Sequence, residues 1–286
     1  MNALVKYQQA TLRPVVEDYD PDFAAEVQAE ILKDFQPTIF TAKDMKFTNK
    51  KTGEQFDTLR GVILAVSTPR FYWPEKDGEK IPFCSSGDSL TGSWNRNAAP
   101  STWDAAMQVE KRFAHPAIAM TAKGELIPDT FNCVSCPLAQ WGSAHQKKNR
   151  AGAGCQERRF LLMQLEGWFT PAIVSLAITS IKHWKSYVST LTSQYGKTWA
   201  EVITELSLIQ ATNQERTKYT EVVFSAVSAL PKQVTLSEVK PLREQFKSLI
   251  HTSTVLENVE YYMSDEQPAE QPINHSATNG GQDIPF

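Results

Sequence analysis

The sequence predicts a mainly β protein with helices (β + α), in which a five-stranded barrel carries a long insertion and a disordered acidic tail follows. Segments rich in β-branched and aromatic residues lie on both sides of residues 74–156, whereas that region is rich in Gly, Ser, Asn and Pro. The region is too long for an ordinary loop, so it needs its own organisation. After Met263 the chain is mainly Gln, Asn, Ser, Pro and Gly, which cannot bury enough apolar surface to fold.

These changes in composition set the expected domain boundaries. The domains are an N-terminal helical extension (1–35), a barrel domain (36–230) with its insertion (74–156), a C-terminal helix (231–262) and a disordered acidic tail (263–286). Scattered acids and helically spaced apolar residues predict the first helix, and the alternation of residues changes to a strand period from Gln36.

The strands of the barrel are expected on both sides of the insertion. They are expected at 38–42, 56–66, 159–165, 200–209 and 219–227, with a further strand-like run at 173–178 and a turn at 49–53. A helix is expected over about 179–194, because its apolar residues, Trp184 among them, share one face and Gly196 can end it. Gly61 inside a strand predicts a bulge or a bend. Strands, one helix and two further strands follow each other as in an OB-fold, whose helix lies between strands three and four.

Composition argues against a membrane or secreted protein. No run of about 18 apolar residues occurs, and the first residues lack the apolar stretch of a secretion signal. We therefore expect a cytoplasmic protein without membrane contact. Six acids and no Lys or Arg occur from Glu257 onward, so the net charge of −3 divides into −6 for residues 257–286 and +3 for residues 1–256. A basic body with an acidic tail favours a nucleic-acid binder, although a solvated terminus without function gives the same pattern.

The four cysteines favour a metal site. Cys133-Val134-Ser135-Cys136 is a C-x-x-C knuckle, whose two sulfurs can reach one tetrahedral ion, and Cys84 and Cys155 provide a second pair in Gly/Ser-rich surroundings. Four thiolates form a closed structural zinc site, which can supply the folding energy of a loop-rich insertion. An iron–sulfur cluster uses the same ligands. His115 or His145 could replace one cysteine, and four buried thiols without a metal remain an alternative.

Three stretches combine cations with aromatic rings, as surfaces for unpaired nucleic acid do. One is the basic region near the knuckle, which contains Trp141, Lys147, Lys148, Arg150, Arg158 and Arg159. The second is Arg70-Phe71-Tyr72-Trp73, where at least one of the three rings should point away from the core of a strand. The third contains Lys182 and Lys185, which we expect to be exposed, and Trp184, which we expect to be buried. Ordinary packing and a solvated basic loop are the alternatives.

The chain resembles a group of phage and plasmid single-stranded DNA-binding proteins with an OB-fold interrupted by a metal-binding insertion. The residues that carry the resemblance are Gly61–Ile63 through Tyr72–Pro74, Cys84–Ser86, Cys133–Pro137 with Trp141–Ser143, Gly154–Cys155 and the terminal Asp283-Ile284-Pro285-Phe286. Its terminus resembles the tip with which bacterial single-stranded DNA-binding proteins recruit replication and repair proteins. A terminal Phe and its carboxylate can fill an apolar pocket beside a basic residue. The acids before this tip are diluted by Gly280, Gly281 and Gln282.

No catalytic set accompanies these features. The sequence has no phosphate loop, no nucleophile elbow, no H-E-x-x-H and no deaminase pattern. The expected function is non-catalytic binding of single-stranded DNA during replication, recombination or repair of a phage or plasmid, with partner proteins recruited through the tip. The alternatives are a metal-dependent nuclease with a structural four-cysteine site and an adaptor that binds only proteins. The oligomeric state stays open, with a homodimer as one alternative.

Overall fold

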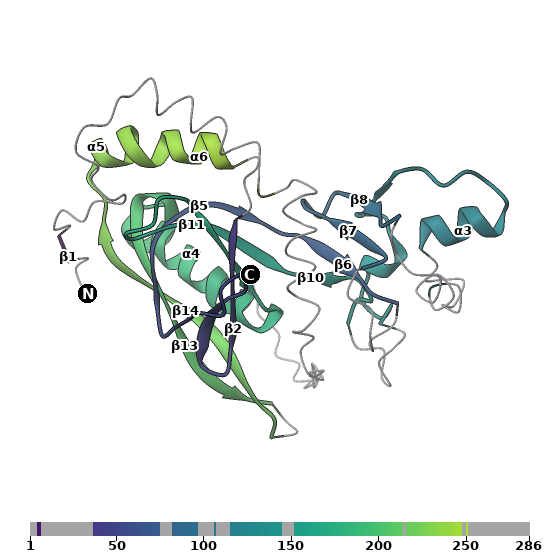
Figure 1. The fold of residues 1–286 in the computed structure, drawn as a ribbon, viewed down its shortest axis with the longest axis horizontal. Helices are drawn as coiled ribbons and strands as arrows, with labels where there is room; N and C mark the ends of the chain where they lie inside the picture. The colour runs from purple at the N-terminus through teal and green to yellow at the C-terminus, as the bar shows by residue number, and fades with distance from the viewer. Residues whose placement is uncertain are drawn as a thin grey trace, which may run out of the picture.

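The computed structural model describes residues 5–6, 37–74, 82–96, 106, 115–144, 152–213, 216–247 and 250. Apart from Val5–Lys6, the predicted N-terminal extension and the acidic tail lie outside this part of the chain. The described protein is mainly β with a few helices, which confirms the coarse prediction of the fold class. Figure 1 shows a large curled sheet on the left and a smaller sheet, formed by the insertion, on the right.

The larger sheet, called the main sheet below, has nine strands in the order β1-β14-β13-β5-β11-β12-β2-β3-β4. The bounds are β1 Val5–Lys6, β2 Thr38–Lys43, β3 Lys46–Asn49, β4 Gln55–Phe56, β5 Leu59–Ser67, β11 Arg159–Leu165, β12 Ala172–Leu176, β13 Val202–Thr212 and β14 Lys218–Ala229. Neighbouring strands are antiparallel, except that β12 is parallel to β2 and β1 is parallel to β14.

The smaller sheet, called the insertion sheet, has five short antiparallel strands in the order β10-β6-β7-β8-β9. The bounds are β6 Arg70–Tyr72, β7 Cys84–Ser86, β8 Thr91–Trp94, β9 Thr130–Asn132 and β10 Gln156–Glu157, and the helices of this region are α3 Pro116–Ala122 and the 3₁₀ turn η2 Pro137–Ala139. A small apolar cluster with Tyr72, Phe83 and Phe131 supports it. The insertion therefore has more regular structure than its loop-like composition predicts.

The remaining helices flank the main sheet. They are η3 Ile178–Ser180, α4 Ile181–Tyr195, η4 Trp199–Glu201, α5 Lys232–Val234, the π-helical stretch η5 Thr235–Val239 and α6 Lys240–Phe246. The helix expected over 179–194 is confirmed as α4, and Gly196 ends it in the left-handed conformation at φ 58°. Helix within the predicted C-terminal segment is confirmed as α5 to α6. No helix in the described residues is long and apolar enough to cross a bilayer.

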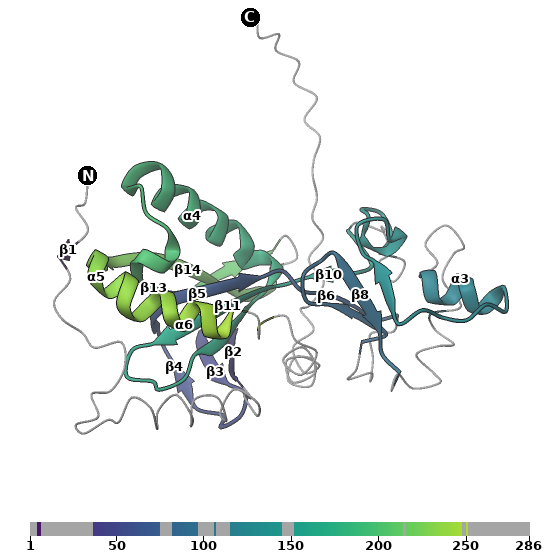
Figure 2. The same ribbon diagram turned by 90° about the horizontal axis from the view of Figure 1, so that it is seen from above.

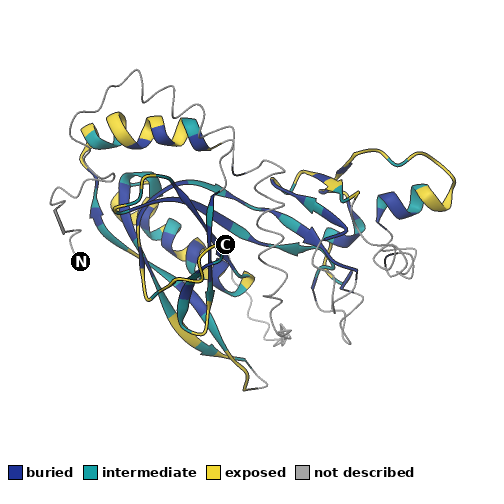
Figure 3. Cartoon of the chain, in the orientation of Figure 1, coloured by how far each residue is buried: buried dark blue, intermediate teal, exposed yellow. Residues whose placement is uncertain are grey.

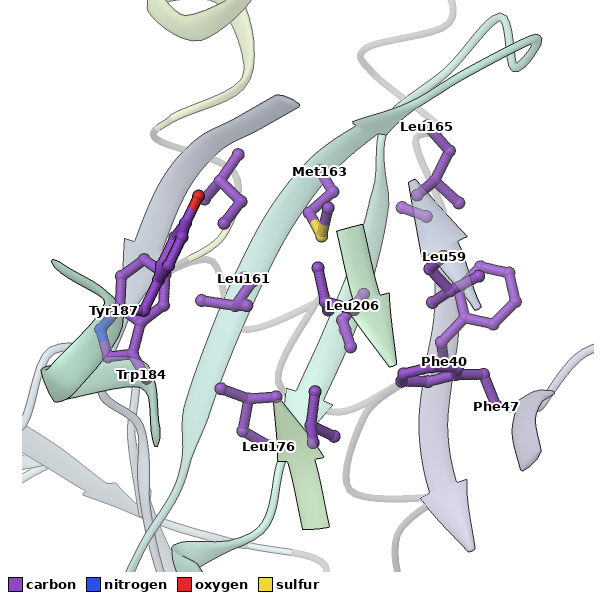
Figure 4. Close-up of a cluster of buried hydrophobic side chains, with 14 of the residues drawn as sticks. Phe40, Phe47, Leu59, Leu161, Met163, Leu165, Leu176, Trp184, Tyr187 and Leu206 are labelled. Carbon is purple, nitrogen blue, oxygen red and sulfur yellow. The ribbon is translucent and has the colours of Figure 1, made fainter. Parts of the chain in front are cut away.

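Each face of the main sheet carries a buried apolar cluster. Because side chains alternate along a strand, β5 sends Val62 and Leu64 to one face and Ile63 to the other. The first face packs against η5 and α6 through Val239, Leu242 and Phe246. The second face packs against α4, whose Trp184 and Tyr187 appear with strand residues in Figure 4. Figures 2 and 3 show α5 to α6 covering the sheet with their buried side, while their outer side is exposed.

Gly61 lies where three strands meet closely. It pairs with Leu165 of β11 and with Thr204 of β13, and the β5–β11 register shifts between Leu162 and Met163. A Cβ at Gly61 would lie 2.1 Å from the backbone oxygen of Gln164. The predicted bulge or bend at Gly61 is not found at the glycine itself: the register shift lies at Leu64, three residues further along β5, whereas Gly61 permits the close approach of the β5 and β11 backbones.

The first strands differ from the prediction in their boundaries. The strand expected over 56–66 is divided, since β4 ends at Phe56 and β5 begins at Leu59. The strand β3 was not predicted, because the turn before it has Asp44 and Met45 at φ 50° and 60° without a glycine. The turn predicted at 49–53 is confirmed: Gly53 has φ 76°, and the Asn49 side chain accepts a hydrogen bond from the Lys51 amide at 2.9 Å.

A two-stranded ribbon joins the main sheet to the insertion sheet. On one side β5 leads into β6, and on the other β10 leads into β11. Ser67 pairs with Phe160 in the main sheet, Arg70 pairs with Glu157 in the insertion sheet, and the Arg158 amide donates to the Pro69 carbonyl at 2.9 Å between them. The two sheets are thus linked by strands that stay paired throughout (Figure 1).

Candidate metal centre

The four cysteines come from four separate places in the insertion. Cys84 begins β7, Cys133 follows β9, Cys136 caps the 3₁₀ turn η2, and Cys155 precedes β10. The insertion sheet brings them together, because their side chains all line one cavity of about 20 Å³. None of the four forms a disulfide bond within the part of the chain that the structure describes. Sequence separations of up to 71 positions, from Cys84 to Cys155, are therefore closed by strand pairing.

The knuckle is held by hydrogen bonds from its neighbours. The Asn132 side chain accepts from the amides of Val134 at 2.8 Å and Ser135 at 3.3 Å, which fixes the turn between the two cysteines. The backbone amides of Leu138 and Ala139 donate to the sulfur of Cys136. These amides lower the pKa of Cys136, but the larger effect of burial raises it, so the neutral thiol is favoured when no cation is bound.

Gly92 on β8 leaves room for two of the sulfurs. A Cβ at this position would lie 2.8 Å from the Sγ of Cys133 and 3.3 Å from the Sγ of Cys84. The sulfurs of Cys133 and Cys84 therefore both lie next to the Cα of Gly92. Any side chain at this position would displace one of them. The Ser86 hydroxyl, two residues after Cys84, donates a hydrogen bond to the Asp88 carboxylate at 3.1 Å.

Burial makes the free thiols weak acids. It raises the pKa of Cys133 and Cys136, and burial together with the nearby Cys136 and Cys133 raises the pKa of Cys155 to about 12. The thiols thus stay protonated at neutral pH unless a cation replaces the protons, as a thiophilic metal ion does.

The four sulfurs are the type of donor that a thiophilic ion prefers, but the cysteine side chains do not converge on one point. Among the described residues no group of three or more Cys, His, Asp and Glu side chains stands close enough to hold a metal ion. The cavity nevertheless has four sulfurs in its wall and room for roughly one water-sized sphere. Side-chain rotation within this cavity is the movement that coordination would require.

The Nδ1 atom of His115 has a structural role. It is therefore not free to replace a cysteine as a metal ligand. This nitrogen accepts a hydrogen bond from the Ala117 amide at 3.1 Å and caps α3. The ring lies parallel to Tyr72 and edge-on to Phe83 and Phe131. Burial lowers the pKa of His115 to about 4, so the ring is neutral at pH 7. His145 lies outside the described residues.

The prediction that one of three adjacent rings points outward is wrong. Phe71, Tyr72 and Trp73 are all buried. Phe71 and Trp73 pack in the core of the main sheet, and Tyr72 packs in the cluster of the insertion. Strand β6 lies between two apolar clusters, so neither of its faces is open to a nucleic-acid base.

Three of the predicted basic contacts are also engaged inside the protein. Arg70 lines the cysteine cavity and pairs with Glu157 at 3.3 Å, and Arg159 lies 3.7 Å from the same carboxylate. Arg158 is buried. These residues lie on or beside the ribbon between the two sheets, where their side chains have neighbours that a sequence pattern does not reveal.

The other predicted site residues have different outcomes. Trp141 lies after η2 and is 61% exposed. Trp184 is buried and Lys182 and Lys185 are exposed, as predicted.

Lys182 and His183 both lie 2.7 Å from the buried carboxylate of Glu221, a pairing that the sequence did not indicate. Lys147, Lys148, Arg150 and the tip Asp283, Ile284, Pro285 and Phe286 lie outside the described residues.

Two residues that shape the cavity were missed. Gly92 is separated from the knuckle in sequence, and only strand pairing brings it close to the cysteines. Asn132 carried a usable signal, because an Asn directly before a C-x-x-C can accept hydrogen bonds from the amides of its turn.

The fold and the cavity define a mainly β protein whose insertion carries four cysteines in the wall of one cavity. Comparisons with known protein families, curated proteins and solved structures give no match for this chain.

Proposed function

We propose that this protein is non-catalytic and binds single-stranded DNA with little sequence preference during replication, recombination or repair of a phage or plasmid. A zinc ion stabilises its insertion, and Asp283–Phe286 recruits partner proteins. The proposal rests mainly on one observation, the order and pairing of five strands in the main sheet.

The pairing of the five strands β5, β11, β12, β13 and β14 supports the proposal of an OB-fold-like barrel. The pairings β5–β11, β11–β12, β5–β13 and β13–β14 are those of its strands one to five, and α4 lies between strands three and four. The remaining contact, between strands three and five, is replaced by β2, which pairs with β12 and contacts β14. A barrel completed by an added strand accounts for this arrangement.

The positions of the two long connections support nucleic-acid binding. In OB-folds, oligonucleotides bind to the loops that join strands one to two and four to five, and to the face of strands two and three. Here the first loop is the whole insertion, between β5 and β11, and the second is the tip of the β13–β14 hairpin. The outer face of β11 and β12 is covered by η5 and α6. We therefore assign the DNA to the two loops and not to the covered face.

Trp141 and the neighbouring cations are the proposed contacts in the insertion. Trp141 is exposed two residues beyond η2, in the sequence that continues with Lys147, Lys148 and Arg150. An exposed ring can stack on a base of any identity, while cations neutralise phosphates. This combination gives salt-sensitive binding without sequence preference.

Zinc is the proposed ion for the cysteine cavity. Cys84, Cys133, Cys136 and Cys155 would hold it, because four thiolates form a closed site that suits zinc and leaves no position for a substrate. An iron–sulfur cluster uses the same ligands, but a cavity of about 20 Å³ favours a single ion. When bound, the ion supplies folding energy to the insertion and performs no chemistry on DNA.

The direct test is fluorescence anisotropy of a labelled single-stranded oligonucleotide over a salt series, with duplex DNA as competitor. The proposal predicts tight binding that weakens with salt and that the duplex competes for poorly. Absence of binding at low salt would overturn the DNA-binding proposal and leave the protein-only adaptor. Turnover of the DNA that depends on a divalent ion would instead identify the nuclease.

Replacing Trp141 with alanine should weaken single-stranded DNA binding about tenfold, because one base loses its stacking partner. The matched control is Phe169→Ala, which removes a ring of similar exposure, 64%, from the loop between β11 and β12. This control should change the affinity less than about twofold. Equal losses in the two variants would show that Trp141 has no special part in binding.

Deleting residues 264–286 should leave the affinity for single-stranded DNA equal or raise it. The deletion removes four acidic side chains that can compete with phosphate for the basic body. A full-length variant with Asp265, Glu266, Glu270 and Asp283 changed to Asn or Gln should behave alike. A large loss of affinity in the anisotropy assay would contradict the role assigned to the tail.

A further inference from the structure

Strand β6 divides its side chains between the main sheet and the cysteine cavity. Phe71 and Trp73 point to the core of the main sheet, whereas Arg70 and Tyr72 line the cavity with the four cysteines. Cross-strand pairing places Arg70 opposite Ser86 and Tyr72 opposite Cys84. Arg70 is thus held beside the sulfurs by the pairing of β6 with β7.

The contacts of Arg70 leave part of its guanidinium available to the cavity. Its Nη2 atom lies 3.3 Å from a carboxylate oxygen of Glu157, which Arg159 also approaches at 3.7 Å. The buried Nε–H of Arg70 has no hydrogen-bond acceptor among the described residues. A buried donor without an acceptor is costly, and a thiolate sulfur in the same cavity is an acceptor that carries charge.

The positive charge of Arg70 beside the sulfurs affects how favourable metal binding is. A divalent ion held by four thiolates has a net charge of −2, and burying such a charge costs free energy unless a cation lies near it. Arg70 carries a positive charge in the wall of the cavity that holds the four sulfurs, whereas its ion-pair partner Glu157 carries a negative charge two residues after Cys155. The two partners of this ion pair therefore influence the thiolates with opposite signs.

We propose that Arg70 is a positioning residue of the metal centre, which balances the charge of the four thiolates, and that Glu157 limits this effect. The inference rests on the proposed zinc site. It gives Arg70 a role in the protein interior in place of the DNA contact that the sequence predicted.

The test is a competition titration of zinc between the full-length protein and a chromophoric chelator at fixed pH. Arg70→Met should weaken zinc binding about 10- to 100-fold, the usual effect of losing a residue that supports metal ligands. Arg70→Lys keeps the charge and should lose only a few-fold. Glu157→Gln removes the opposing charge and should tighten zinc binding a few-fold.

The matched control is Arg60→Met. Arg60 of β5 also pairs with a glutamate across strands, with its Nε 3.1 Å from Glu166, but it does not line the cavity. Its replacement should leave zinc affinity unchanged. Circular dichroism of each metal-free variant identifies any loss of folding that is independent of zinc.

The direction in which Glu157→Gln changes the zinc affinity distinguishes two explanations. In one, Arg70 balances the charge of the thiolates; in the other, the Arg70–Glu157 ion pair only stabilises the sheet. If the Arg70–Glu157 pair only stabilised the sheet, breaking it from either side would weaken zinc binding, and this result would overturn the inference. Wild-type affinity in Arg70→Met would also overturn it while leaving the zinc site intact. Absence of zinc binding by the wild-type protein would overturn both proposals.

Discussion

Replacing Gly61 with alanine is expected to destabilise the main sheet by more than about 3 kcal/mol or to prevent folding. The new Cβ would lie 2.1 Å from the backbone oxygen of Gln164 and 2.9 Å from the Cα of Leu165. Both atoms belong to the backbone of β11, so no side-chain rotation can relieve the overlap. The two strands would have to separate where β5 also pairs with β13. Urea unfolding followed by far-ultraviolet circular dichroism measures the loss.

Gly53→Ala provides the matched control. Gly53 has φ 76°, so an alanine there is strained, but nothing lies within 4 Å of its Cβ. This change should cost about 1 kcal/mol. A Gly61→Ala protein as stable as Gly53→Ala would show that β5 and β11 do not approach as closely as described.

Removing the proposed zinc ion is expected to unfold the insertion while the main sheet remains folded. The insertion has only a small apolar cluster, and Cys84 and Cys136 belong to it, whereas the main sheet has a large core on each face. Metal binding contributes on the order of 10 kcal/mol in small zinc domains, more than this cluster can replace. A strong chelator or Cys136→Ser should therefore make the insertion sensitive to protease and produce a separate unfolding transition.

Ser135→Ala is the control for this experiment, since Ser135 is an exposed residue in the same knuckle. It should keep one zinc ion per chain by elemental analysis and the protease resistance of the wild-type protein. If metal-free wild-type protein resists protease equally well, the insertion does not depend on a metal.

The elements with strong local patterns were predictable from the sequence. The strands β11 and β14 and the helix α4 were placed within about two residues, because their apolar periods and the glycine at the end of α4 are local signals. The insertion sheet was not predicted. Its strands have two to four residues and contain Cys, Ser, Thr and Gly in place of an apolar alternation. Their stability comes from pairing with distant segments, which a local pattern does not express.

In the candidate site, too, features with a local sequence signal were predictable, and features that depend on distant segments were not. Cys84 and Cys155 line the same cavity as the knuckle, but the four side chains do not converge on one point, so the four-cysteine ligand set stays a prediction. The metal itself stays a prediction. The expectation of an exposed ring at Phe71–Trp73 failed because it assumed that one face of this strand is open to solvent. Burial on both faces depends on what the rest of the chain places around a strand, and the sequence of three residues cannot indicate it.

The ribbon that joins the two sheets has a consequence for how such a chain could be assembled. The insertion leaves the main sheet through β5 and returns through β11, two strands that are paired with each other. Its two ends are therefore adjacent, so the segment between them can be lengthened, shortened or exchanged without changing the connectivity of the other strands. Phe71 and Trp73 set the limit of such an exchange, since the core of the main sheet includes them. The exchangeable part of the insertion therefore begins after Trp73. The residues before that point belong structurally to the main sheet.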